Sequence, residues 1–143
     1  LPSVALALIS VLLLSRIMVH SGMIDTLASA AAAVLGSAWP AAVPLVGALG
    51  SFITGSATAS NILFGGFQVA AADASGLAPL LALAGQGFGA AIGNVIAPHN
   101  IVAGAATVGL IGREGATLKA TLPVCLAYAA MGGLLLLVLA AAS

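Results

Sequence analysis

The chain alternates long apolar stretches with short polar interruptions, and this pattern defines its expected elements. A helix needs about 20 apolar residues to cross the hydrocarbon core of a bilayer. The pattern predicts an all-α, polytopic membrane protein with a single transmembrane domain over residues 1–143. We expect spans at about residues 1–20, 22–36, 77–96 and 120–142, a hairpin over 41–72 and one arm of a broken helix over 101–111.

A polar run, TGSATASN over Thr54–Asn61, lies between two apolar arms that are each too short to span a bilayer. Non-helical backbone at membrane depth is tolerated only where protein or trapped water surrounds it. Transporters use such interruptions to direct helix ends at substrates and coupling ions. The run therefore predicts the tip of a re-entrant hairpin that binds a ligand, although Ser60 or Asn61 could instead simply cap a helix. The candidate substrate-binding residues in the run are Thr54, Ser56, Thr58, Ser60 and Asn61.

A second interruption, GNVIAPHN over Gly93–Asn100, follows the next apolar stretch. Pro98 has no N–H and breaks the helix, which exposes backbone carbonyls near it. Asn94 and Asn100, on either side of this break, are further candidates for substrate binding. His99 is a candidate for proton coupling because its charge changes near neutral pH. The alternative is a neutral imidazole that is hydrogen-bonded to a neighbouring helix.

A third polar cluster contains Arg16, His20 and Asp25. Arg16 and His20 share one face of a helix, and an arginine can pair with a substrate carboxylate through two hydrogen bonds. Arg16 could also extend to the membrane interface or pair with Asp25. His20 and Asp25 are, like His99, candidates for proton coupling.

Three other residues are expected to have structural roles. Trp39 precedes Pro40 at a predicted helix break and is expected to anchor the chain at the membrane interface. Gln68 and Gln86 are amides within apolar stretches, and the ordinary role of such amides is to bridge helices.

The composition defines the class of protein: of 143 residues, 62% are hydrophobic and 4% are charged, with a net charge of zero. Soluble domains carry roughly a quarter charged residues, so the expected partner is the lipid bilayer. The chain has no basic patch, which excludes nucleic-acid binding. It lacks catalytic motifs and Cys–His metal spacing, so we expect no enzyme, cofactor or metal site. It begins without methionine and ends on an apolar stretch, so we expect the carboxy-terminal piece of a larger protein whose amino-terminal part is missing.

Three segments carry a resemblance to a known family. They read SGMIDTLA over 21–28, WPAAVPLVGALGSFITGSATASNILFGGFQ over 39–68 and GAAIGNVIAPHNIVAGAATVGLIGREG over 89–115. With the closing apolar span, they resemble the carboxy-terminal part of the L-lactate permease family. The resemblance implies a secondary carrier that moves L-lactate, or the related 2-hydroxy acid glycolate, inward with protons across the bacterial inner membrane. It also implies kinship with a wider group of anion transporters whose hairpin tip holds a carboxylate, here through Ser56, Thr58, Ser60 and Asn61.

Other functions stay open from the sequence alone. A carrier of the same architecture could couple to sodium and move a di- or tricarboxylate, although such substrates call for more fixed positive charge than Arg16 supplies within the membrane. A channel could use the polar interruptions as a filter. A truncated piece of a carrier could have no activity of its own.

Overall fold

The structure is a computed structural model that describes the backbone of residues 2–142 and the side chains of residues 9, 10 and 12–142. Every element in this part of the chain is helical, which confirms the predicted all-α class. The elements are α1 (Pro2–His20), α2 (Met23–Leu35), the short 3₁₀ helix η1 (Gly36–Ala38), α3 (Trp39–Thr54), α4 (Ala57–Ser75), α5 (Pro79–Gly93), α6 (Pro98–Thr107) and α7 (Glu114–Ala141).

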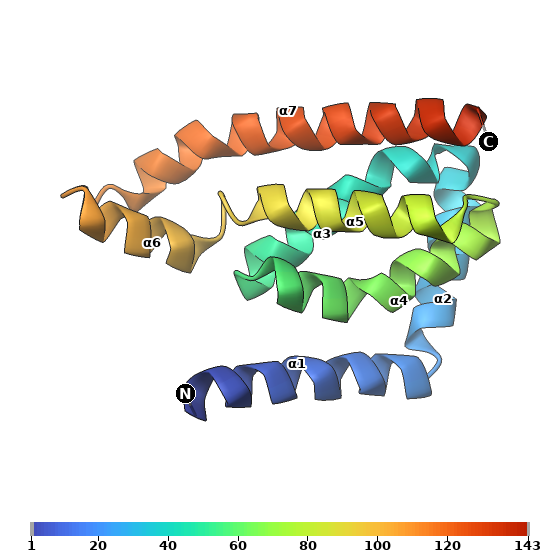
Figure 1. Cartoon of the computed structure of the whole chain (residues 1–143), viewed down its shortest axis with the longest axis horizontal. Helices are drawn as coiled ribbons and strands as arrows, with labels where there is room; N and C mark the ends of the chain where they lie inside the picture. The colour runs from blue at the N-terminus through green and yellow to red at the C-terminus, as the bar shows by residue number, and fades with distance from the viewer. Residues whose placement is uncertain (1, 143) are drawn as a thin grey trace.

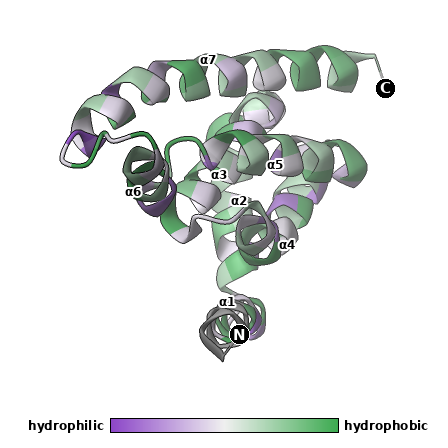
Figure 2. Ribbon diagram, turned by 60° about the vertical axis from the view of Figure 1, so that its left-hand side comes forward, coloured by the Kyte–Doolittle hydropathy of each residue, from purple (hydrophilic) through white to green (hydrophobic). Residues whose placement is uncertain are grey.

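Two helical segments among the described residues are long and apolar enough to span a bilayer. They are Met23–Thr54, which joins α2, η1 and α3, and Glu114–Ala141, which is α7. The helices α5 and α6 pass the same test together but are bent by 42° at the break between them. Large apolar side chains such as Leu134 and Val138 are exposed on α7, and Figure 2 shows hydrophobic colours along most of this helix. Such a surface suits contact with lipid, as a membrane protein requires.

Helix α3 lies at the centre of the fold, where it packs against α4, α5 and α7 (Figure 1). Its contact with α5 is close because glycines face the neighbouring backbone. A Cβ atom on Gly89 would overlap the backbone of Pro44, and one on Gly93 would overlap the backbone of Ala48. Small residues are the usual means by which helices approach closely in membranes.

Helices α3 and α4 form a helical hairpin whose connection consists of Gly55 and Ser56. Gly55 adopts a left-handed conformation with φ 67°, which ends α3. Ser56 is extended, and its hydroxyl accepts a hydrogen bond from the N–H of Ala59 at 3.3 Å. This cap starts α4 at Ala57, so most of the polar run lies in the first turns of a helix and not in a loop.

The helix boundaries differ in part from those expected. Helix α4 continues to Ser75, beyond the expected end of the hairpin at residue 72. Helix α6 extends from Pro98 to Thr107. It can begin at Pro98 because the first N–H groups of a helix have no acceptor within the helix, so the missing N–H of proline costs no hydrogen bond. Helix α7 begins at Glu114, which makes much of the polar segment before residue 120 helical.

The environment of Trp39 also differs from the expectation. The indole is only 2% exposed and packs edge-on against Phe67, with ring centroids 5.5 Å apart. The short helix η1 continues α2 into α3, and this carries Trp39 into the core between α3 and α4. The expectation that Trp39 anchors the chain at the membrane interface is therefore wrong.

We predict that Gly89→Ala separates α5 from α3, because the added methyl group would overlap the Pro44 backbone. Extra volume in a well-packed contact typically costs about 1–3 kcal/mol. Gly87→Ala on the same helix is the matched control, since nothing lies within 4 Å of a Cβ atom there. Thermal unfolding of the full-length protein in detergent should show a lower midpoint for Gly89→Ala alone, and equal midpoints would contradict this packing.

Candidate functional site

Hydroxyl groups of the polar run hold the connection between α3 and α4. The Thr54 hydroxyl donates to the carbonyl of Gly50 at 2.8 Å and accepts from the N–H of Ser56 at 3.3 Å. The Ser56 hydroxyl caps α4, as described above. Both side chains are half-buried, so they mainly stabilise the tip of the hairpin.

The break between α5 and α6 lies directly against this tip, and Figure 1 shows the two connections close together. The His99 imidazole fills the space beside Gly55, where a Cβ atom would overlap the ring. The Asn100 side chain donates from Nδ2 to the carbonyl of Gly55 at 3.4 Å and to the carbonyl of Asn94 at 3.1 Å. The structure thus brings the two polar interruptions of the sequence together.

A buried layer of amides supports the tip from inside. Ser60 is fully buried, and its hydroxyl donates to the carbonyl of Gly47 at 2.9 Å. Gln86 donates from Nε2 to the Ser60 hydroxyl at 3.0 Å and to Oδ1 of Asn61 at 3.4 Å. Gln68 donates from Nε2 to Oε1 of Gln86 at 2.9 Å. The two glutamines bridge helices as expected, and in addition they reach the polar run, which their positions in the sequence did not indicate.

The exposed polar groups lie on the outer side of this layer. Thr58 and Asn61 are three residues apart on α4 and therefore share one helix face, and both are exposed. His99 and Asn100 are exposed at the start of α6. The candidate residues therefore divide into an exposed group, a half-buried group at the connection, and the buried Ser60.

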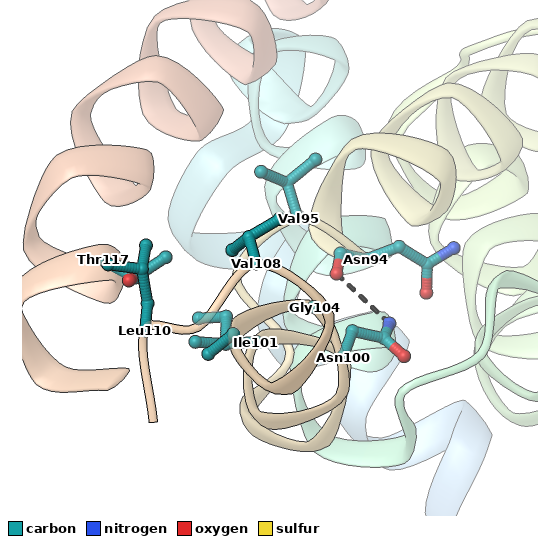
Figure 3. Close-up of a pocket in the computed structure, with 9 residues that line it drawn as sticks. Asn94, Val95, Asn100, Ile101, Gly104, Val108, Leu110 and Thr117 are labelled. Atoms are coloured by element: carbon teal, nitrogen blue, oxygen red, sulfur yellow. Dashed lines mark hydrogen bonds between the residues drawn. The ribbon is translucent and has the colours of Figure 1, made fainter. Parts of the chain in front are cut away.

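A cavity of about 240 Å³ lies next to the α5–α6 break. Figure 3 shows the amides of Asn94 and Asn100 on one side of it and Leu110 and Thr117 on the other. Its lining is apolar apart from the two asparagines and Thr117. The side-chain oxygen of Asn94, Oδ1, is buried and has no hydrogen-bond partner in the described part of the chain. The backbone carbonyl of Asn94, in contrast, accepts from Asn100.

The third polar cluster is not part of this arrangement. Arg16, His20 and Asp25 are all exposed on α1 and α2. Within residues 2–142 no ion pair joins Arg16 to Asp25, and no hydrogen bond joins either residue to the hairpin tip. Helix α1 does contact α4, where the Ser15 hydroxyl donates to the carbonyl of Ile62 at 3.1 Å.

Comparison with known proteins identifies the family of the chain. A family model described as L-lactate permease matches residues 1–142. The chain belongs to the L-lactate permease family. A putative L-lactate permease of Haemophilus influenzae is 35% identical over 137 residues, which are 92% of this chain and 26% of that protein. No solved structure matches the chain.

Two further relatives of the permease family carry names that bear on substrates. The L-lactate permease of Streptococcus iniae is 50% identical over 64 residues, which are 45% of this chain and 14% of that protein. The glycolate permease of Escherichia coli strain K12 is 36% identical over 118 residues, which are 82% of this chain and 21% of that protein. The chain thus spans about a quarter or less of the length of these relatives, and its membership confirms the resemblance expected from the sequence.

We predict that Gly55→Ala destabilises the tip by more than backbone strain alone. Gly76, which ends α4 with φ 76°, is the matched control because a Cβ atom there meets nothing within 4 Å. Alanine in a left-handed conformation costs about 1–2 kcal/mol at either position. Only at Gly55 would the methyl group also displace the His99 ring.

The measurement is thermal unfolding of a full-length family member that carries this segment. Gly55→Ala should lower the midpoint more than Gly76→Ala, and adding His99→Ala to Gly55→Ala should remove the difference. A double variant that stays as unstable as Gly55→Ala would show that the ring does not occupy this space.

Proposed function

We propose that this chain forms the carboxylate-binding part of a carrier that takes up L-lactate, or a related 2-hydroxy monocarboxylate such as glycolate, together with protons. The names of the relatives, L-lactate permease and glycolate permease, support the substrate class. The observation that carries the proposal is the contact between two helix breaks, at which the His99 and Asn100 side chains of α6 lie against Gly55, in the connection that joins α3 to α4.

The start of α4 suits an anion for a physical reason. The first amides of a helix have no acceptor within the helix, and together with the helix dipole they favour negative charge. Thr58 and Asn61 add an exposed hydroxyl and an exposed amide on one face of the first two turns of α4. A 2-hydroxy acid offers a carboxylate and a hydroxyl on neighbouring carbons, so both groups of the substrate can find a partner on this face.

The other members of the polar run support this face. In the proposal, Thr54 and Ser56 shape the connection, while Ser60 fixes α4 to α3 from the buried side. Asn100 and Asn94 close the site from the α5–α6 break. The hairpin is re-entrant in the proposal, and the carrier lies in the inner membrane of a bacterium with the rest of its helices supplied by the remainder of the family's length.

Proton coupling is assigned first to His99 in this proposal. Of the three candidates, His99 is the one whose ring lies against the tip, whereas His20 and Asp25 are exposed on other helices. A histidine can exchange a proton near neutral pH without a large change in its environment. The substrate contact does not depend on Arg16. No observation favours the sodium-coupled carrier or the channel.

We predict that Asn61→Ala and Thr58→Val each weaken lactate binding by a full-length carrier. A hydrogen bond to a charged group contributes about 1.5–3 kcal/mol. Its loss should raise the KM for lactate roughly 10-fold to 100-fold. Ser75→Ala, at the far end of α4, is the control because its hydroxyl bonds only within its own helix. Uptake of labelled lactate into vesicles gives the KM, and an unchanged value in the Asn61/Thr58 double variant would exclude this face as the site.

We also predict that His99→Gln uncouples transport from protons. Glutamine keeps hydrogen-bonding capacity but cannot carry the proton. Lactate accumulation driven by an imposed pH gradient should fall toward equilibrium, while exchange of labelled for unlabelled lactate continues. His20→Gln serves as the control with normal accumulation. If the His99→Gln carrier still accumulates lactate in proportion to the gradient, the proton travels through another group.

A further inference from the structure

The direction of the hydrogen bonds in the buried layer is fixed by the backbone of α3. The carbonyl of Val43 can only accept, so the group of Gln68 that faces it at 3.1 Å must be the NH₂ group. The same Nε2 atom donates to Oε1 of Gln86 at 2.9 Å. Gln68 is fully buried, and its own Oε1 atom has no hydrogen-bond partner among the described residues.

The bond from Gln68 then determines how the amide of Gln86 is oriented. Because Oε1 of Gln86 accepts from Gln68, its NH₂ group points to the other side, toward α4. There Nε2 donates to the hydroxyl of Ser60 at 3.0 Å, and to the backbone carbonyl of Ser60 and Oδ1 of Asn61, each at 3.4 Å. The Ser60 hydroxyl in turn gives its own proton to the carbonyl of Gly47. The bonds from Gln68 to Gln86 and from Gln86 to Asn61 thus run in one direction, and Asn61 accepts the last of them.

We propose that Gln68 and Gln86 are positioning residues that hold the Asn61 amide with its oxygen inward and its NH₂ group outward, as a donor for the substrate carboxylate. An asparagine amide can otherwise turn over and present either end, since its oxygen and nitrogen differ little in shape. An outward oxygen would repel a carboxylate. The chain of amides therefore selects an anionic ligand over a neutral one without placing a charged residue at membrane depth, where a charge is costly.

The inference rests on the proposed function, since it assigns a role within the same carboxylate site. Gln68 and Gln86 do not touch the substrate themselves but orient the residue that does. The positioning role also predicts a change in ligand preference that a merely structural role would not produce.

The test compares lactate with lactamide, the neutral amide of the same acid, in a full-length carrier. In Gln86→Glu burial keeps the carboxyl group neutral, so it has one proton where the amide had two, and the oxygens of Ser60 lie closest to it. Oδ1 of Asn61 then loses its donor, and the Asn61 amide becomes free to turn its oxygen outward. The ratio of lactate affinity to lactamide affinity, measured by inhibition of labelled lactate uptake, should fall at least tenfold. The lactate KM should rise, while the thermal midpoint of the carrier shows how much folded protein is present.

A second variant keeps the inference testable if a glutamate at this buried position prevents folding. Gln68→Met has nearly the same shape but no amide, so Oε1 of Gln86 loses its donor. The Gln86 amide is then held toward Asn61 less firmly, and the ratio should again fall. Ser51→Ala is the matched control, because the Ser51 hydroxyl also bridges α3 and α5, by donating to the carbonyl of Ala90, but takes no part in the chain of amides. Ser51→Ala should lower stability and leave the ratio unchanged.

The outcomes separate the two proposals. If wild-type carrier transports lactate and Asn61→Ala weakens its binding, but Gln86→Glu or Gln68→Met folds and keeps the ligand ratio, the positioning role is wrong and the proposed function stands. If Ser51→Ala shifts the ratio as much as Gln68→Met does, the effect is one of packing and the inference is overturned. If Asn61→Ala binds lactate normally, the site itself lies elsewhere.

Discussion

The need of buried side-chain donors for acceptors on neighbouring helices shapes the contact of α3, α4 and α5. Three polar side chains are buried between α3, α4 and α5, and each donates to an acceptor on a neighbouring helix. They are Gln68, Gln86 and Ser60. These bonds are possible only because α5 approaches α3 closely. A Cβ atom on Gly47 would overlap the backbone carbonyl of Gln86, so the missing side chain brings that glutamine within reach of the tip. The close packing of α3 and α5 is thus what allows the buried polar side chains to reach their hydrogen-bond partners.

The same need for hydrogen-bond partners explains why a helix starts within the polar run. The Ser56 cap satisfies an amide of α4 that lipid could not satisfy, and the Thr54 hydroxyl satisfies another at the connection. The cap also sets the rotation of α4 about its axis. With the helix starting at Ala57, Ser60 faces α3 and Asn61 faces outward. One short connection therefore decides which side chains of α4 face α3 and which face outward, where the proposed site lies.

Features that depend on local chemistry were predictable from the sequence. The length of the apolar stretches indicates a helical membrane protein. The helix breaks at the polar run and at Pro98 follow from the capping hydroxyl groups and from the missing N–H of proline. The inward direction of Ser60 was not predictable, because it depends on where α4 begins. The bonds between Gln68 and Gln86 and the burial of Trp39 depend on tertiary packing, for which no local signal exists. Only the structure therefore reveals that the amides of Gln68 and Gln86 lie beneath the hairpin tip.

The contacts of the tip differ in strength between its two sides. Toward α3 and α5, the tip is attached through buried bonds from Ser60 and Gln86, and breaking them would leave polar groups without partners in a region that excludes water. Toward α6, it is attached through an exposed bond of 3.4 Å from Asn100 and through the exposed His99 ring. Groups released on that side can be satisfied by water or by a ligand, so separation there costs less. In the proposed site, the hairpin and α5 would therefore form the firm part, and α6 would be the wall that yields to admit a substrate.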